Sequence, residues 1–341
     1  MSLARLTKHR TALLLAAVAC GVAVSAKGSS AQRADRGTLD TLTFWSQSLG
    51  TRKRAVVWLP PSYATSPGTR FPSLYYLHGL WGSETDWTKQ GHLDATLDSL
   101  TAAGLPGMVV VMPDGDDGWY TTWNKLIDIS VCRRDFVPRE GETVESYCVP
   151  WPRYDDYIAR DLVAAVDGRY RTLGTRAHRA IAGLSMGGYG AVSLALQYPD
   201  VFRAAASHSG VVSPSYAGSH PFDGTPRYAP SDSSLRAAWG EKMWPLIAPA
   251  FGADTTAWLA RDPARRAQRL VAAHSTLIPD IFLDCGTDDG LIDQARVLRV
   301  ELTRLGLAPV YAEWRGKHDW DYWSIHARES LAWLARQVSG T

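Results

Sequence analysis

Short apolar runs alternate with amphipathic stretches along most of the chain. Between the runs, apolar side chains recur every three or four residues, which is the spacing of one helix face. Strands that alternate with helices predict a mostly parallel sheet with helices on both faces, so the pattern indicates an α/β fold. The expected strands are residues 39–48, 55–59, 73–78, 108–112, 179–182, 203–209, 281–285 and 310–314, and the expected helices are near 93–100, 156–166 (capped by Asp156), 189–198, 293–305 and 322–338.

Two long segments interrupt this alternation. Residues 116–153 show little periodicity but carry several aromatic side chains, and loops of this length are typical of functional segments. Residues 213–279 contain turns and short helices, as a cap beside a site would. No repeat or linker divides the remainder. We therefore expect a disordered lead-in at residues 27–37 and a single domain over 38–341, with a cap-like insertion at about 213–279.

Composition narrows the classes of partner. The 341 residues are 45% hydrophobic and 21% charged, which is ordinary for a globular protein with one large core. The net charge of +2 gives no indication of a nucleic-acid partner or a polyanionic substrate. The densest basic run, residues 261–269, is interpreted as the solvated face of a helix.

The N-terminus has the pattern of an export signal. Arg5, Lys8 and Arg10 precede an apolar run at residues 11–24, and a small-residue cleavage site follows, so we predict a signal peptide over residues 1–26. The run is shorter than the roughly 20 residues of a spanning helix. We therefore expect a secreted or periplasmic protein without stable membrane association. Acylation of Cys20, as in a lipoprotein, is the alternative.

Cysteine spacing predicts a disulfide rather than a metal site. Cys132 and Cys148 flank a polar loop that a disulfide would close in an oxidising compartment, whereas Cys285 is expected to be buried and free. The acidic run that begins at Asp114 lacks the glycine spacing of a calcium loop, and Lys125 stands where a bidentate glutamate is needed. We interpret that run as a turn and expect neither a metal nor a cofactor.

The stretch from Gly183 to Gly188 has the form Gly-x-Ser-x-Gly between an expected strand and an expected helix. A strand that turns directly into a helix in this way presents the serine hydroxyl at the edge of the sheet. Gly183 and Gly187 lack Cβ atoms, so the helix can approach closely. Ser185 is therefore the candidate nucleophile.

A nucleophilic serine needs a histidine base and an acid, and strand ends downstream supply both. His318 lies in a loop after the strand at residues 310–314 and is the candidate base. Asp288 and Asp289 follow the strand at residues 281–285, and the residues alone do not separate them as the acid. The order Ser, Asp, His is the order found in α/β-hydrolases.

An oxyanion hole needs two amide donors. We expect one from Met186, directly after the nucleophile, and the other from Leu80, after the break at His78-Gly79, with His78 structural. Five aromatic residues are candidates for an aryl or sugar subsite, with packing as the alternative for each: Trp81, Trp87, Trp119, Tyr120 and Trp123.

Several motifs in order resemble the esterase D-like family, which includes feruloyl and acetylxylan esterases of carbohydrate esterase family one, S-formylglutathione hydrolases and antigen 85-type mycolyltransferases. The resemblance implies an α/β-hydrolase fold, a Ser-Asp-His triad with Asp289 as the acid, and oxyanion amides at Leu80 and Met186. The motifs are Leu77-His78-Gly79-Leu80, Gly82 with Trp87, Pro113-Asp114-Gly115, Tyr154-Asp155-Asp156-Tyr157, Gly183 to Ala191, and Gly316-Lys317-His318-Asp319-Trp320.

The resulting hypothesis is a secreted serine carboxylic ester hydrolase that acts through an acyl-enzyme. Its expected partner is a small-molecule or carbohydrate ester, of the feruloyl or acetyl type. One alternative is an acyltransferase that delivers the acyl group to a sugar hydroxyl, as mycolyltransferases do. A second is a catalytically silent member that serves as a binding module.

Overall fold

The computed structural model describes residues 36–139 and 141–339, and an eight-stranded sheet runs through this part of the chain. Its strand order is β1-β2-β4-β3-β5-β6-β7-β8, and only the β1–β2 and β2–β4 pairs are antiparallel. The strands are β1 (Thr38–Ser46), β2 (Thr51–Leu59), β3 (Ser73–Leu77), β4 (Val109–Pro113), β5 (Arg179–Leu184), β6 (Ala204–His208), β7 (Asp280–Gly286) and β8 (Val310–Trp314). The mostly parallel sheet is as the sequence predicted.

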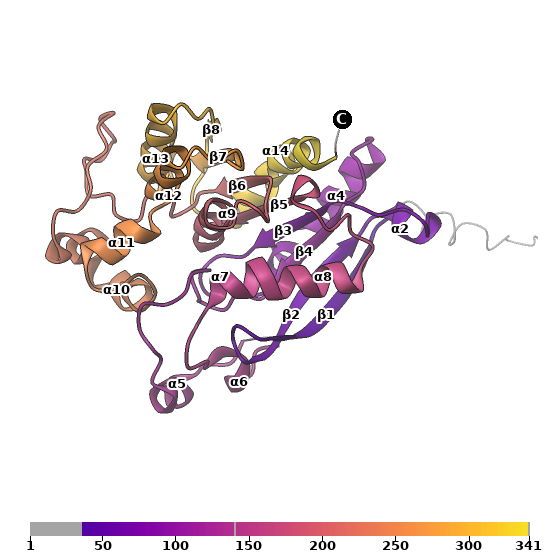
Figure 1. Ribbon diagram of the computed structural model, residues 1–341, viewed down its shortest axis with the longest axis horizontal. Coiled ribbons are helices and arrows are strands. Elements are labelled where there is room, and N and C mark those ends of the chain that lie inside the picture. The colour runs from indigo at the N-terminus through magenta and orange to yellow at the C-terminus, as the bar shows by residue number, and fades with distance from the viewer. Residues whose placement is uncertain (1–35, 140, 340–341) are drawn as a thin grey trace, which may run out of the picture.

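Helices cover both faces of the sheet (Figure 1). The strand β3 shows why both faces need cover. All five of its residues are buried, and successive side chains point into the cores on opposite faces of the sheet. Tyr75 and Leu77 pack in the core under α8 and α9, whereas Leu74 and Tyr76 pack under α4 and α14. The helices named here are α4 (Leu93–Ala102), α8 (Val163–Arg169), α9 (Met186–Gln197) and α14 (Trp320–Val338).

The strand β2 begins four residues earlier than predicted. The expected strand began at residue 55, but residues 52–54 also pair with β1, with Lys53 opposite Phe44. Lys53 is 1% exposed, and its ammonium lies 2.6 Å from Asp114 and 2.7 Å from Asp116. A lysine buried in this way needs carboxylate partners, which the run after β4 supplies.

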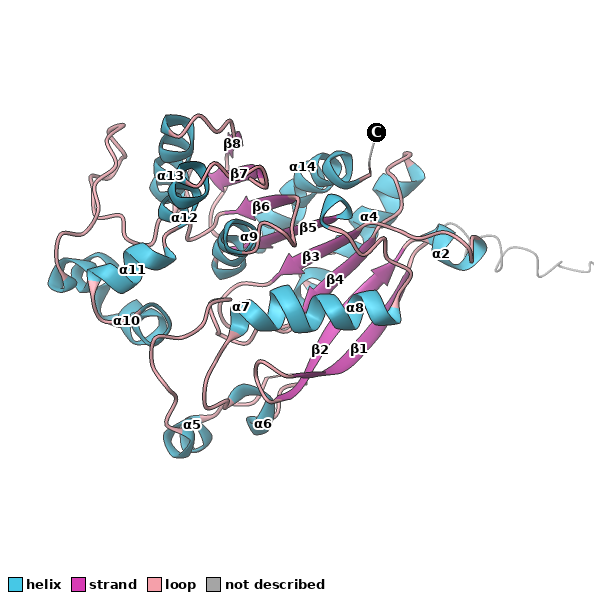
Figure 2. Cartoon of the chain, in the orientation of Figure 1, coloured by secondary structure: helices cyan, strands magenta, loops and turns pink. Residues whose placement is uncertain are grey.

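A helix also begins earlier than predicted, before Asp156. α7 (Tyr154–Asp156) continues through a π-helical turn, η1 (Tyr157–Leu162), into α8. Asp156 therefore lies inside the helical run and is not its cap. The segment 116–153 contains α5 (Ile129–Asp135) and α6 (Val144–Tyr147), which lie together beyond the end of the β1–β2 hairpin (Figure 2).

Three helices occupy most of residues 213–279. They are α10 (Asp232–Phe251), which breaks at Gly240 with φ 68, then α11 (Thr255–Arg261) and α12 (Pro263–Ala272). The basic run of α12 is not simply solvated as expected. Arg266 is buried and donates to the backbone oxygen and hydroxyl of Ser193 on α9, which fastens α12 to the helix that follows the candidate nucleophile.

The predicted signal peptide and Cys20 lie outside the described residues, as does most of the lead-in. Within the described residues, no helix has the length and apolar character needed to span a membrane. The remaining helices are α2 (Pro61–Thr65), α3 (Asp86–Lys89), the short 3₁₀ helix η2 (Arg176–His178) and α13 (Ile292–Arg304).

The N-cap of α12 makes stability depend on pH. Asp262 is 0% exposed; one carboxylate oxygen accepts from the Ala264 amide and the other has no hydrogen-bond partner. Burial raises the pKa of Asp262 to about 7. The folded state therefore holds this proton more tightly than the unfolded chain does. The stabilisation is complete below about pH 4, the usual aspartate range, and is lost as pH rises through about 7.

We therefore predict that Asp262→Asn, which keeps a good N-cap without the charge, melts at a higher temperature than the wild type at pH 8. The gain in the free energy of unfolding should be on the order of a few kcal/mol at most and should disappear near pH 4. Thermal melts at pH 4 and pH 8 measure it. A difference that is independent of pH would contradict the assignment to Asp262.

Candidate active site

Ser185 occupies a strained corner between β5 and α9. Its φ of 52 and ψ of −117 are unusual for a residue with a side chain. The Ser185 amide donates to the His208 backbone oxygen at 3.0 Å, and the Ser185 backbone oxygen accepts from Val211 at 3.2 Å. These bonds tie the corner to the end of β6, and the hydroxyl is left facing the pocket.

Two glycines allow this corner to close. A Cβ on Gly183 would lie 2.5 Å from the Gly187 backbone oxygen, and a Cβ on Gly187 would lie 2.5 Å from the backbone oxygens of Leu77 and His78. Real Cβ atoms do not approach backbone that closely. The Gly-x-Ser-x-Gly pattern therefore has a direct steric cause.

His318 bridges the serine and an aspartate. Its Nδ1 lies 2.8 Å from Asp289 Oδ2 and its Nε2 lies 2.9 Å from Ser185 Oγ. A carboxylate only accepts, so Nδ1 donates to Asp289, and Nε2 of that tautomer accepts from the serine hydroxyl. The three residues come from the ends of β5, β7 and β8, which meet at one edge of the sheet.

Asp289 is 3% exposed and also accepts from the Leu291 amide at 2.8 Å. Burial acts to raise the pKa of this carboxyl, but the hydrogen bond and charge of His318 outweigh it and hold the pKa below its usual range. Asp289 therefore stays ionised beside the imidazole. The side chain of Asp288, the alternative left open by the residues, is exposed.

The turn Gly79 to Gly82 brings Leu80 to the same site. The Gly79 backbone oxygen accepts from His78 Nδ1 at 2.7 Å and from the Gly82 amide at 3.1 Å, while His78 Nε2 accepts from the Gly115 amide at 2.9 Å. In a trans peptide the N–H points opposite to the C=O. The Leu80 N–H is therefore directed away from His78, and Met186 is the first residue of α9, where amides lack helical partners.

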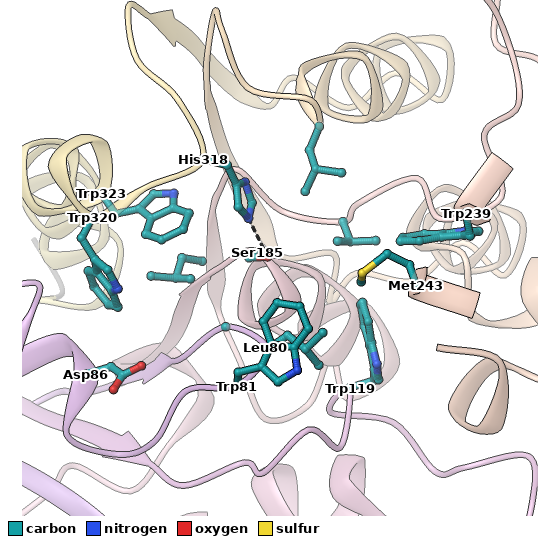
Figure 3. A pocket seen from close by; sticks show the side chains of 14 residues that line it. Leu80, Trp81, Asp86, Trp119, Ser185, Trp239, Met243, His318, Trp320 and Trp323 are labelled. Carbon is teal, nitrogen blue, oxygen red and sulfur yellow. Dashed lines mark hydrogen bonds between the residues drawn. The ribbon is translucent and has the colours of Figure 1, made fainter. Parts of the chain in front are cut away.

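A largely apolar cavity of about 400 Å³ surrounds the serine. In Figure 3, Trp320 and Trp323 lie on one side of Ser185 and His318, and Trp119, Trp239 and Met243 lie on the other. The cavity is lined by Gly79, Leu80, Trp81, Asp86, Trp119, Leu184, Ser185, Val211, Trp239, Met243, Leu291, His318, Trp320 and Trp323.

Two of the five predicted aromatic residues, Trp81 and Trp119, line this cavity. The other three do not, and the subsite prediction is corrected for them. Trp87 is buried against Tyr76 and Trp320 and donates to the Leu77 backbone oxygen. The polar atoms of the remaining two residues also form hydrogen bonds within the protein. Tyr120 is fully buried, and its hydroxyl donates to the His78 backbone oxygen. The Trp123 indole donates to the Gly118 backbone oxygen.

Among the tryptophan and methionine side chains of the cavity wall, four were not predicted from the sequence: Trp239, Met243, Trp320 and Trp323. Trp239 and Met243 come from α10, whose place over the site depends on tertiary packing that periodicity does not report. Trp320 and Trp323 lie in the first turn of α14, directly after the candidate base. Their closeness to His318 in sequence is a signal that could have identified them.

One acidic cluster in the described residues has the spacing of metal ligands, formed by Asp114, Asp116 and Glu142. The Lys53 ammonium already contacts two of these carboxylates. A second cation would lie beside a buried positive charge, and the repulsion would be strong at low dielectric. Asp114 and Asp116 therefore belong to a buried ion-pair network with Lys53. The sequence of this run had indicated only a turn.

Cys132 and Cys148 form a disulfide, with their Cα atoms 5.8 Å apart. It closes the segment that contains α6. Cys285 is free and buried in β7, where burial raises the pKa of its thiol well above the usual range. The thiol is therefore protonated and inert at neutral pH.

Sequence comparison places the chain in a family. The family model described as "Putative esterase" matches residues 46–334. The chain belongs to this esterase family. The resemblance that the motifs predicted is confirmed, and an ester hydrolase is the class of enzyme that the match supports.

Curated relatives carry related names. An endo-1,4-beta-xylanase/feruloyl esterase of Xylanibacter ruminicola is 31% identical over 190 residues, which are 53% of this chain and 23% of that protein. An acetyl esterase of Caldicellulosiruptor saccharolyticus is 25% identical over 264 residues, or 77% of this chain and 83% of that protein. The chain spans only 23% to 32% of the length of three of the relatives it matches.

Solved structures support the fold. A ferulic acid esterase superimposes with a TM-score of 0.64 at 24% identity, covering 89% of this chain and 99% of the other. The predicted α/β-hydrolase fold is confirmed.

We predict that Gly187→Ala destabilises the fold by about 1–3 kcal/mol, because the added methyl overlaps the Leu77 and His78 backbone. Displacement of the serine should also lower the rate of ester hydrolysis by about 100-fold. Gly168→Ala is the matched control, since its Cβ meets nothing within 4 Å. Thermal melts and ester turnover measure both effects, and equal behaviour of the two variants would refute the steric argument.

Proposed function

We propose that the protein is a serine carboxylic ester hydrolase with Ser185 as nucleophile, His318 as base and Asp289 as the orienting acid. The observation that carries this proposal is the unbroken chain of hydrogen bonds, 2.9 Å from Ser185 to His318 and 2.8 Å from His318 to Asp289. The esterase family match supports the same reaction class. An intact relay of this kind argues against a silent binding module.

In the proposed mechanism, His318 Nε2 takes the proton of Ser185 as Oγ attacks the ester carbonyl carbon. The amides of Leu80 and Met186 stabilise the oxyanion. His318 then gives its proton to the leaving alcohol, and an acyl-enzyme remains. A water molecule, deprotonated by His318, attacks the acyl carbon, and Ser185 is released with its proton restored. Asp289 keeps the imidazole in the correct tautomer throughout.

For the substrate we infer an acyl group with apolar or aryl character on a carbohydrate or small alcohol. Supporting observations are the tryptophan-rich cavity walls and the feruloyl and acetyl esterases among the relatives. Trp81 and Trp119 are the aromatic residues that we retain as substrate contacts, and Trp239 and Met243 join them. We treat residues 213–279 as a cap within a single domain over 38–341, because α10 supplies these last two side chains.

We also propose that the protein is exported. The basic and then apolar pattern of residues 1–26 supports an export signal. The disulfide between Cys132 and Cys148 supports an oxidising compartment as the destination.

Acyl transfer to a sugar hydroxyl is the second candidate. The apolar walls around Ser185 favour it, because a wall of this kind limits the access of water to an acyl-enzyme.

We predict that Ser185→Ala lowers turnover of p-nitrophenyl acetate, p-nitrophenyl butyrate and methyl ferulate by at least about 1000-fold. Loss of the hydroxyl removes the acyl-enzyme route entirely. Ser233→Ala, an exposed serine of α10, is the control and should match the wild type. Comparable turnover by Ser185→Ala would refute the proposed nucleophile.

We predict that kcat/KM rises with pH through the range in which imidazoles lose their proton, because a histidine base acts only when unprotonated. Asp289 should add no second limb in this range, since its lowered pKa keeps it ionised. A pH–rate profile on p-nitrophenyl acetate measures this. A rate that is constant from pH 5 to 9 would count against a histidine base.

The reaction products distinguish hydrolysis from acyl transfer. If hydrolysis is the activity, added xylo-oligosaccharide should leave the yield of free acid from methyl ferulate unchanged. If the protein is a transferase, acylated sugar should form at the expense of free acid. Chromatography of the products measures the ratio.

A further inference from the structure

The turn that carries Leu80 is tied to a segment far from the triad in sequence. Trp81 has φ 64, a conformation that a bulky residue keeps only where its surroundings hold it. Its backbone N–H donates to Asp117 Oδ1 at 2.7 Å. The Leu80–Trp81 peptide is therefore fixed by Asp117, just as the Gly79–Leu80 peptide is fixed by His78.

Asp117 is itself held by two side chains from within the disulfide-closed segment. The Arg139 guanidinium donates to both carboxylate oxygens, at 3.3 Å and 2.5 Å, and the Tyr147 hydroxyl lies 3.4 Å from Oδ2. The guanidinium also lies over the Tyr147 ring, 5.9 Å from its centroid. The Asp117 and Arg139 side chains are 13% and 24% exposed, so solvent screens this pair only partly.

We propose that Asp117 and Arg139 are positioning residues for the oxyanion turn and that the Cys132–Cys148 segment acts as its external brace. With the peptides on both sides of Leu80 fixed, the direction of the Leu80 N–H and the place of Trp81 on the cavity wall are set together. An oxyanion donor is effective only when it is held in place before the reaction. This inference rests on the proposed function, in which the Leu80 amide binds the oxyanion.

Arg139→Ala tests the brace, with Arg134→Ala as the matched control. Arg134 lies in the same segment but is exposed and pairs only with Asp135 among the described residues. The measurements are kcat and KM for p-nitrophenyl acetate and the affinity for phenylboronic acid. This acid adds to a nucleophilic serine and forms a tetrahedral anion in the oxyanion hole.

For Arg139→Ala we expect kcat and boronate affinity each to fall about tenfold, less than the 100-fold or more for complete loss of a donor. KM and the affinity for acetate, a planar product, should stay within about twofold, because the ground state makes little use of the hole. Asp117→Asn keeps an acceptor for the Trp81 amide but loses the charge. Its kcat and boronate affinity should therefore lie between those of the wild type and of Arg139→Ala. Arg134→Ala should match the wild type.

Boronate affinity reports on folded sites alone, so a variant that is only less stable does not imitate the expected result. The inference is overturned if both Arg139→Ala and Asp117→Asn bind the boronic acid as the wild type does. It is also overturned if boronate and acetate affinity fall by the same factor. If Ser185→Ala retains full turnover, the proposed function itself is refuted. If Ser185→Ala is inactive but Arg139→Ala and Asp117→Asn bind the boronic acid as the wild type does, only the positioning role is refuted.

Discussion

The close approach of the β5–α9 corner to the end of β3 is the constraint on which the site depends. Gly187 lies where any Cβ would meet the backbone oxygens of Leu77 and His78, and Gly183 lies against Gly187 in the same way. This contact brings the serine corner and the Leu80 turn together. Backbone contacts of this kind leave little freedom, so the strained φ of Ser185 is held by the packing around it.

Polar contacts in the interior extend this constraint across the sheet. The backbone oxygen that receives the Ser185 amide belongs to His208, whose ring lies 2.6 Å from Asp284. Asp284 in turn accepts from the Tyr322 hydroxyl at the start of α14, the helix that follows the candidate base. The candidate nucleophile and the candidate base are thus both linked to buried contacts between β6, β7 and α14. The buried hydrogen bond from Tyr322 to Asp284 favours a single arrangement of the surrounding core.

The sequence predicted the parts of the molecule in which local pattern and local geometry coincide. Buried strands, the Gly-x-Ser-x-Gly corner and the strand-end loops of Asp289 and His318 all belong to this class. The early start of β2 was not predicted, because the carboxylates that compensate the buried charge of Lys53 lie some 60 residues away. The wall of Trp239 and Met243 was missed for a similar reason, since no periodicity reports which helix lies over a site. Trp87 and Tyr120 were predicted as substrate contacts because they are aromatic, but both side chains are buried in the core and do not line the cavity.

The most direct test of the central claim is the detection of the covalent intermediate. The protein is mixed with p-nitrophenyl butyrate, quenched in acid within the first turnover, and digested for mass spectrometry of its peptides. If Ser185 is the nucleophile, a butyryl group is expected on the peptide that contains Ser185 and on no other peptide. A butyryl group on a different residue, or rapid release of p-nitrophenol with no acylated peptide, would contradict it.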